Sequence, residues 1–145
     1  METLSNIIEN DEWAGAEGTH KCLPLIIRFR PKLSPALELS AFPQLIQVFW
    51  GYSEHPSGMP SPEDSEKMEV FENRLVGALE SDLSGLLASV ITTNGYREWV
   101  LYTKSIDVFS ERLHNMPQEE EPYPIQVEAG HDPSWTYFFE NVRPE

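Results

Sequence analysis

Few side chains in this sequence have the types and the spacing that catalysis or metal binding requires. His20-Lys21-Cys22 and His131-Asp132 are candidate halves of a metal site, and neither has a matching second half elsewhere. Cys22 is the single cysteine, which excludes an internal disulfide. It comes before an apolar, strand-like run, so we expect a small inert side chain there rather than a nucleophile. The sequence therefore predicts no catalytic residue, no metal site and no cofactor.

Glu72 is the carboxylate in the most interesting position. It lies four residues after Met68, at the margin of an apolar helical stripe that includes Phe71 and Leu75. A carboxylate there could be half-buried and hold Arg97 or a tyrosine hydroxyl. The competing interpretation is an ordinary boundary glutamate that meets water or an ion pair, and we favour it over a catalytic role.

Arg28 and Arg30 project from one face of a strand expected over residues 22–30. Two guanidinium groups on one face could grip an anion. In so acidic a chain, however, we expect them to pair with nearby carboxylates.

The chain has 145 residues and a formal net charge of −14, from 24 acidic against 10 basic residues. This length suits one domain with a sizeable core, so we expect a single domain over residues 1–145, with residues 1–11 poorly ordered. The charge repels phosphate backbones, which excludes nucleic acid as a partner, and it attracts basic protein surfaces. Glu119, Glu120 and Glu121 form the densest acidic cluster.

The start of the chain lacks the basic region and the apolar run of a secretory signal. No apolar run approaches the ~20 residues of a membrane span. We therefore expect a protein of the reducing cytoplasm that does not bind membranes.

A β-hairpin over residues 86–103 is the element around which the rest must be placed. Two runs rich in β-branched and aromatic residues flank Asn94-Gly95, which tolerates the positive φ angles of a type I′ turn and so fixes the register. The predicted pairs are Thr93–Tyr96, Thr92–Arg97, Ile91–Glu98, Val90–Trp99 and Ala88–Leu101. One face should carry Leu86, Ala88, Val90, Trp99 and Leu101, with Thr92 and Arg97 near the turn. The other should carry Leu87, Ile91, Val100 and Tyr102, with Ser89 and Glu98.

Apolar periodicity places the other elements along the chain. It predicts strands over 13–17, 22–30, 44–52 and 123–129, and helices over 62–83 and 105–115. Their buried residues should include Ile106, Phe109, Leu113, Ile125 and Val127. Asp132-Pro133 indicates a short terminal helix, with Asp132 as its cap and Trp135 as a core anchor.

From residue 44 onward, the order is strand, helix, strand, strand, helix, strand. This order is the split β-α-β of ferredoxin-like folds, an antiparallel sheet with two helices on one face. Extra N-terminal strands and the short C-terminal helix complete the expected α+β domain.

Several short motifs, in a shared order over nearly the whole length, resemble the bacterial family called domain of unknown function 695. The matching pieces are Trp13 with Gly18, Pro24 to Arg30, Val48 to Tyr52, Gly58 to Pro60, Phe71-Glu72, Thr93 to Trp99 with Tyr102, and Asp132 to Trp135. The sheet layout and the last motif are also similar to the regulator of ribonuclease activity B, a small acidic protein with a ferredoxin-like core that acts by binding an enzyme. The resemblance implies a fold and a non-catalytic role.

These observations predict a non-catalytic protein that binds a partner protein with a basic surface and modulates or neutralises it, as an enzyme regulator or a toxin-immunity protein does. Candidate binding residues are Glu119, Glu120, Glu121, Tyr96, Glu98 and Tyr102. A small enzyme or small-molecule binder that uses the uncovered sheet face, lined by Tyr96, Val100 and Tyr102, is the alternative. A homodimer through that face or an edge strand is a third hypothesis.

Overall fold

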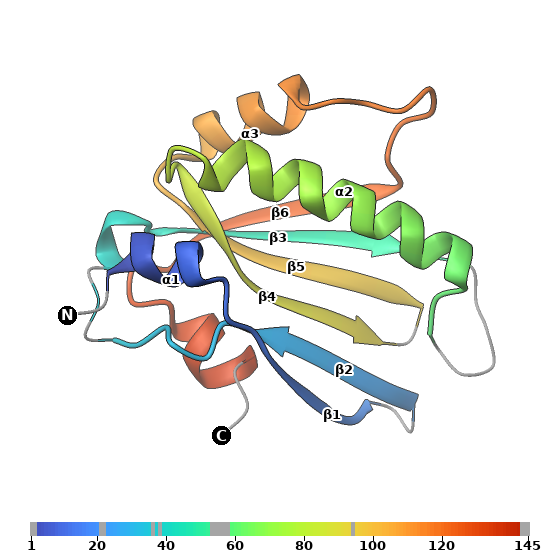
Figure 1. The fold of residues 1–145 in the computed structure, drawn as a ribbon, viewed down its shortest axis with the longest axis horizontal. Helices are drawn as coiled ribbons and strands as arrows, with labels where there is room; N and C mark the ends of the chain where they lie inside the picture. The colour runs from blue at the N-terminus through green and yellow to red at the C-terminus, as the bar shows by residue number, and fades with distance from the viewer. Residues whose placement is uncertain are drawn as a thin grey trace.

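The computed structural model describes residues 3–20, 23–35, 37, 39–52, 59–93 and 95–142 (Figure 1). Two predictions of the sequence analysis, the role of Cys22 and the conformation of Asn94, lie outside these residues. The strands are β1 (Ala14–His20), β2 (Leu23–Phe29), β3 (Gln44–Gly51), β4 (Gly85–Thr93), β5 (Tyr96–Thr103) and β6 (Ile125–His131). The helices are α1 (Leu4–Asn10), α2 (Pro62–Glu80), α3 (Ile106–Asn115), the 3₁₀ turn η1 (Leu39–Ala41) and the π-helical turn η2 (Tyr137–Val142).

The strands form one six-stranded sheet in the order β1-β2-β4-β5-β3-β6, and every neighbouring pair is antiparallel. The predicted α+β class and all four predicted strands outside the hairpin are confirmed. β3 lies between β5 and β6. Its Val48 packs on the side of the sheet that faces α2 and α3, and its Leu45 packs on the opposite side. Figure 1 shows α2 and α3 lying together across one side of the sheet.

α2 begins as the sequence predicted and ends earlier. Ser61 caps it, with its hydroxyl accepting the Asp64 N–H at 3.1 Å, and Pro62 occupies the first turn. The helix ends at Glu80 instead of Leu83, because Leu83 itself takes up a left-handed conformation (φ 55°) that cannot continue a helix. The next strand, β4, begins at Gly85.

The hairpin register is confirmed from Thr93–Tyr96 through Val90–Trp99. The predicted Ala88–Leu101 pair is wrong, because a β-bulge between Leu87 and Ser89 adds one residue to β4 and pairs Leu87 with Leu101. A one-residue shift exchanges the faces of all residues beyond it. Leu87 therefore belongs to the core cluster under α2, whereas Leu86 and Ala88 belong to the cluster on the opposite face.

The bulge leaves backbone groups of Leu87 beyond the last residue of β2, and a buried ion pair binds them. Arg30 Nε donates to the Leu87 carbonyl at 2.8 Å, and the Leu87 N–H donates to Glu80 Oε2 at 2.9 Å. Arg30 and Glu80 also contact each other, with Nη2 3.1 Å from Oε1, and the Arg30 side chain is only 1% exposed. The ion pair thus makes the backbone hydrogen bonds with Leu87 that a neighbouring strand would otherwise make. The prediction that Arg30 pairs with a nearby carboxylate is confirmed.

The second face of the sheet is not open. Residues 4–10, expected to be poorly ordered, form α1 because Thr3 caps the helix and Leu4 and Ile7 are buried. Together with η1 and η2 they pack against the hairpin residues that the sequence analysis left uncovered. The cluster contains Leu4, Ile7, Leu33, Leu39, Phe42, Leu86, Ala88, Ile91, Val100, Tyr102, Trp135, Phe138 and Val142. A binding site on that face, with Val100 and Tyr102 in its lining, is therefore contradicted.

Two smaller predictions about burial were also wrong. Ile106 is 39% exposed at the start of α3, where Phe109 makes the buried contact instead. Val127 is 42% exposed on β6, an edge strand of the sheet.

Candidate functional site

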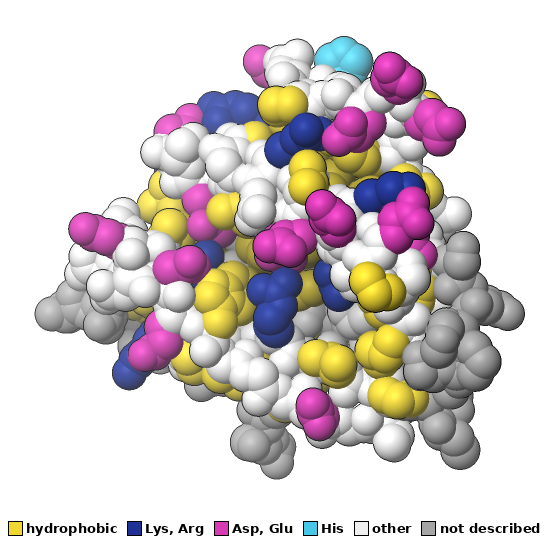
Figure 2. All heavy atoms as spheres, turned by 45° about the vertical axis from the view of Figure 1, so that its right-hand side comes forward, with side chains coloured by type: hydrophobic (Ala, Val, Ile, Leu, Met, Phe, Trp, Pro, Cys, Tyr) yellow, Lys and Arg dark blue, Asp and Glu magenta, His cyan; other side chains and the backbone are white. Residues whose placement is uncertain are grey.

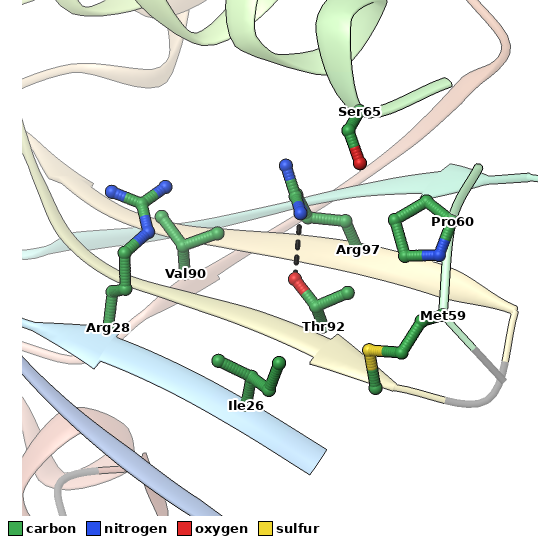
Figure 3. Close-up of a pocket in the computed structure, with 8 residues that line it drawn as sticks. All are labelled: Ile26, Arg28, Met59, Pro60, Ser65, Val90, Thr92 and Arg97. Carbon is green, nitrogen blue, oxygen red and sulfur yellow. Dashed lines mark hydrogen bonds between the residues drawn. The ribbon is translucent and has the colours of Figure 1, made fainter. Parts of the chain in front are cut away.

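A cleft of about 290 Å³ opens between the start of α2 and the ends of three neighbouring strands (Figure 3). Its lining combines two arginines and two hydroxyls with four apolar side chains. The lining residues are Ile26, Arg28, Met59, Pro60, Ser65, Val90, Thr92 and Arg97.

Strand register explains why these side chains meet. In β2 and β4, Ile26 lies opposite Thr92 and Arg28 lies opposite Val90, and the hairpin then places Thr92 opposite Arg97. Paired residues of antiparallel strands point to the same face, so all five side chains face α2. Ser65 lies one turn into α2, and Met59 and Pro60 precede that helix.

Arg97 is held by one side-chain hydrogen bond. Its Nε donates to Thr92 Oγ1 at 2.8 Å, and the two terminal nitrogens have no hydrogen bond to any residue that the structure describes. These terminal nitrogens are therefore not fully buried, because every fully buried side-chain nitrogen of the described residues has a hydrogen-bond partner. Burial lowers the pKa of Arg97, while the charge of Glu72 opposes this and the like charge of Arg28 adds to it. The guanidinium remains a cation at neutral pH.

Arg28 is held more firmly than Arg97. Its Nη2 donates to Glu72 Oε1 at 2.7 Å, and the guanidinium lies 5.5 Å from the centre of the Trp13 ring. Glu72 Oε1 also accepts the Trp99 indole N–H at 2.9 Å. Glu72, which the sequence analysis offered to Arg97 or a tyrosine, therefore binds Arg28 and Trp99, and its side chain is only 14% exposed.

The cleft can supply hydrogen-bond donors and positive charge. Among the described residues that line it, there is no histidine, cysteine or carboxylate that could act as a base or a nucleophile. Within the described ranges, no group of three or more His, Cys, Asp or Glu side chains is arranged to hold a metal ion. The same ranges contain no helix with the length and apolar character needed to cross a membrane.

The acidic cluster predicted to bind a partner lies on the surface between α3 and β6. Glu119 Oε1 accepts from Arg74 Nη1 at 3.0 Å, and Arg74 also donates to the Tyr123 hydroxyl at 2.7 Å. Glu120 and Glu121 are exposed. The cluster therefore presents the exposed carboxylates of Glu120 and Glu121 next to Glu119, whose carboxylate forms an ion pair with Arg74.

The other predicted binding residues lie apart from this cluster. Glu98 is buried and accepts hydrogen bonds from Gln47 Nε2 at 3.0 Å and from the Tyr137 hydroxyl at 2.8 Å. Burial raises the pKa of Tyr137, and the charge of Glu98 adds to the shift. Tyr96 is half-buried beside Phe49, with ring centres 6.1 Å apart.

Tyr102, Asp132 and Trp135 form one structural unit. The Tyr102 ring stacks on Trp135 with centres 4.0 Å apart, and its hydroxyl donates to Asp132 Oδ2 at 2.8 Å. Burial raises the pKa of Tyr102 well above its usual range. Asp132 also accepts the N–H groups of Thr136 and Tyr137, both at 2.9 Å, so it caps the terminal turn.

Sequence reasoning identified Arg28 and Arg97 separately and missed the cleft that joins them. The hairpin register did place Thr92 and Arg97 opposite each other. No pattern in the sequence connects β2 to β4, since that pairing joins residues sixty or more positions apart.

Comparison with known proteins gives one match. The model of the Family of unknown function (DUF695) matches residues 11–142, which is most of the chain. No curated protein and no solved structure matches.

Proposed function

Because the chain belongs to the Family of unknown function (DUF695), whose description names no activity, we propose a function from the chain's own surface. The protein is a non-catalytic binding protein for the basic surface of another protein, which it modulates or neutralises. The observation that supports this proposal is that most of the described basic residues form ion pairs within the chain.

Most described basic side chains are engaged by acids of the same chain. The ion-paired ones are Arg28, Arg30, Lys32, Lys67, Arg74 and Arg112. Lys104 lies over the Phe42 ring at 5.4 Å. Few of the described Lys and Arg side chains are thus available to bind an acidic partner. Because the chain has a net charge of −14, its acidic side chains outnumber the basic side chains that could pair with them.

Acidic side chains are spread over the face shown in Figure 2, and most of the Lys and Arg side chains there lie beside one. A field of this sign accelerates encounter with a basic protein surface and repels nucleic acid. Glu120 and Glu121 are the acids we expect to act first, because they are exposed in an irregular segment where substitution does not disturb the core.

We further infer that β3 to β6 form a ferredoxin-like core. Support comes from the spatial order β4-β5-β3-β6, from the antiparallel pairing, and from α2 and α3 packing on one face of these strands. The similarity to the regulator of ribonuclease activity B, a non-catalytic binder of an enzyme, accords with both inferences and carries neither of them alone.

The test is association kinetics with a partner recovered by cross-linking in the native cell. Glu120→Gln/Glu121→Gln should slow association and flatten its salt dependence with little change in dissociation, since rim charges set mainly the on-rate. Glu119 is kept, because its loss would also free Arg74. Glu17→Gln/Glu140→Gln removes two exposed charges elsewhere and is the matched control.

Three outcomes would contradict the proposal. One is a partner whose contact surface is acidic. Another is equal association rates and salt slopes for the wild type and both double variants. The third is a stable homodimer through an edge strand, β1 or β6, detected by light scattering, with no other protein cross-linked.

A further inference from the structure

We infer that the cleft between α2 and the strands β2, β4 and β5 binds a singly charged carboxylate that carries a small apolar body. The carboxylate is that of a free organic acid or of the last residue of a peptide. This site is separate from the acidic surface used in the proposed function, and its test needs no partner protein.

Charge balance in the cleft favours one anion. Arg28 is neutralised by Glu72, which is held in place by the Trp99 indole. Arg97 has no carboxylate within hydrogen-bonding distance among the described residues. Glu69 also acts on Arg97 electrostatically, but it is exposed, so water and salt weaken its effect. One uncompensated positive charge remains in a chain of net charge −14.

The geometry of Arg97 suits a carboxylate. The bond from Nε to Thr92 Oγ1 fixes the plane of the guanidinium and directs its terminal nitrogens away from Thr92. A fixed guanidinium presents two parallel donors, which match the two oxygens of a carboxylate. Figure 3 shows the Arg97 guanidinium standing between the side of the cleft with Arg28 and the side with Ser65, whose hydroxyl can donate to the same anion.

The rest of the lining selects the kind of anion. Ile26, Val90, Met59 and Pro60 offer an apolar wall beside the two arginines. A volume of about 290 Å³ lies at the lower end of the range for ligand sites, so the body must be small. The overall negative field opposes phosphates, which carry nearly two charges at neutral pH, more strongly than it opposes a carboxylate with one.

A bound carboxylate would also compensate the Arg97 guanidinium for its partial loss of hydration. Arg97 is partly desolvated, which is why its pKa is lowered, and it receives only the Thr92 hydroxyl in return. A half-buried cation with unused donors gains more from an anion than an exposed cation does.

The test is titration of the full chain with hexanoate, followed by the Nε–Hε signals of its arginines in ¹⁵N NMR spectra. We expect a saturable shift of the Arg97 signal with hexanoate and none with hexanamide, which has the same body without the charge. Inorganic phosphate should shift it less than hexanoate at equal concentration. A dipeptide ending in leucine, compared with its C-terminal amide, distinguishes the two sources: tighter binding than hexanoate assigns the carboxylate to a peptide end.

Variants make the assignment specific to this site. Arg97→Gln lacks the Arg97 signal, so its binding is followed by the signal of Arg28, which lines the same cleft. It should weaken hexanoate binding at least about tenfold, since a charged hydrogen-bonded pair is lost. Thr92→Val keeps the charge and frees the guanidinium, so it should weaken binding by a smaller factor. Arg112→Gln is the matched control, because that arginine pairs with Asp82 outside the cleft, and it should bind as the wild type does. A thermal melt of each variant confirms that it is folded.

Equal shifts with hexanoate and hexanamide would overturn the inference. Unchanged hexanoate binding by folded Thr92→Val and Arg97→Gln variants would do the same, as would the absence of a saturable shift in the wild type.

Discussion

The Trp99 indole N–H donates to Glu72 Oε1 across 2.9 Å, and the same oxygen accepts from Arg28. The contact joins one of the two fully buried tryptophans of the described chain to the carboxylate that holds one arginine of the cleft. Core packing and cleft geometry are therefore coupled through a single oxygen atom, and a substitution in the core can be detected at the surface.

Trp99→Ala should lower the free energy of unfolding by about 3–5 kcal/mol, because it leaves a large cavity and removes the donor to Glu72. Trp99→Phe retains most of the volume and should cost less. Urea denaturation measures both, and Val127→Ala, at an exposed position, should change stability by no more than about 0.5 kcal/mol. A melting temperature unchanged by Trp99→Ala would contradict the packing described above.

Two glycines predict opposite effects of the same substitution. A Cβ at Gly85 would lie 2.7 Å from Thr103 Cγ2 and 3.1 Å from the Tyr102 carbonyl oxygen, so Gly85→Ala should destabilise by about 1–3 kcal/mol. A Cβ at Gly77, within α2, meets no atom within 4 Å, so Gly77→Ala should stabilise by about 0.5–1 kcal/mol. Thermal melts of the two variants measure both effects. Melting temperatures that shift in the same direction would count against the backbone placement of β4.

The ion pair of Arg30 and Glu80 gives a prediction about pH. Burial raises the pKa of Glu80 despite the nearby Arg30, so the folded protein holds this proton more tightly than the unfolded chain does. The contribution of Glu80 to stability is therefore fully present below the unfolded pKa and is lost as pH rises through the folded one. The stability of the wild type relative to Glu80→Gln should fall as pH rises from about 4 to 7.

Chemical denaturation of both proteins at several pH values measures this difference, and other carboxylates cancel from it. A difference that rises with pH would show that attraction to Arg30 outweighs desolvation. Glu80→Ala is expected to cost about 3–5 kcal/mol, since it leaves Arg30 buried without its partner.

Asp82 should titrate far below an ordinary aspartate. Hydrogen bonds from Arg112 at 2.6 and 3.1 Å lower the pKa of Asp82 to about 2. Because this pKa is depressed, the pair contributes to stability above the unfolded pKa and ceases to contribute as pH falls towards 2. Arg112→Gln should raise the pKa of the Asp82 carboxyl towards the usual value of about 3.9, as followed by its ¹³C chemical shift. Arg74→Gln should leave it unchanged; an Asp82 titration unaffected by Arg112→Gln would contradict the contact.

The hairpin could be predicted from the sequence because a two-residue turn dictates the pairing of the residues next to it. The prediction failed from Ala88 towards the start of β4, where every residue is buried and no polar alternation marks the extra residue. At the bulge the backbone of Leu87 is bound by Glu80, at the end of the preceding helix, and by Arg30, from a distant part of the chain.

The filled second face could not be foreseen for a related reason. α1 and η2 are short, and each buries only a few residues, so neither has a periodic pattern strong enough to predict its packing. The cleft escaped prediction because it is formed where β2, β4, β5 and the start of α2 come together, although each arginine was noticed alone.

Trp135, Phe138 and Val142 complete the second core cluster, and they are synthesised long after the hairpin against which they pack. On the ribosome, all the elements from α1 to β6 emerge before these residues do. Until residues 135–142 have left the exit tunnel, the nascent chain presents Val100 and Tyr102 to solvent, as a target for chaperones and for association with other nascent chains. A pause in translation at any point before residues 135–142 have left the tunnel would prolong that exposure.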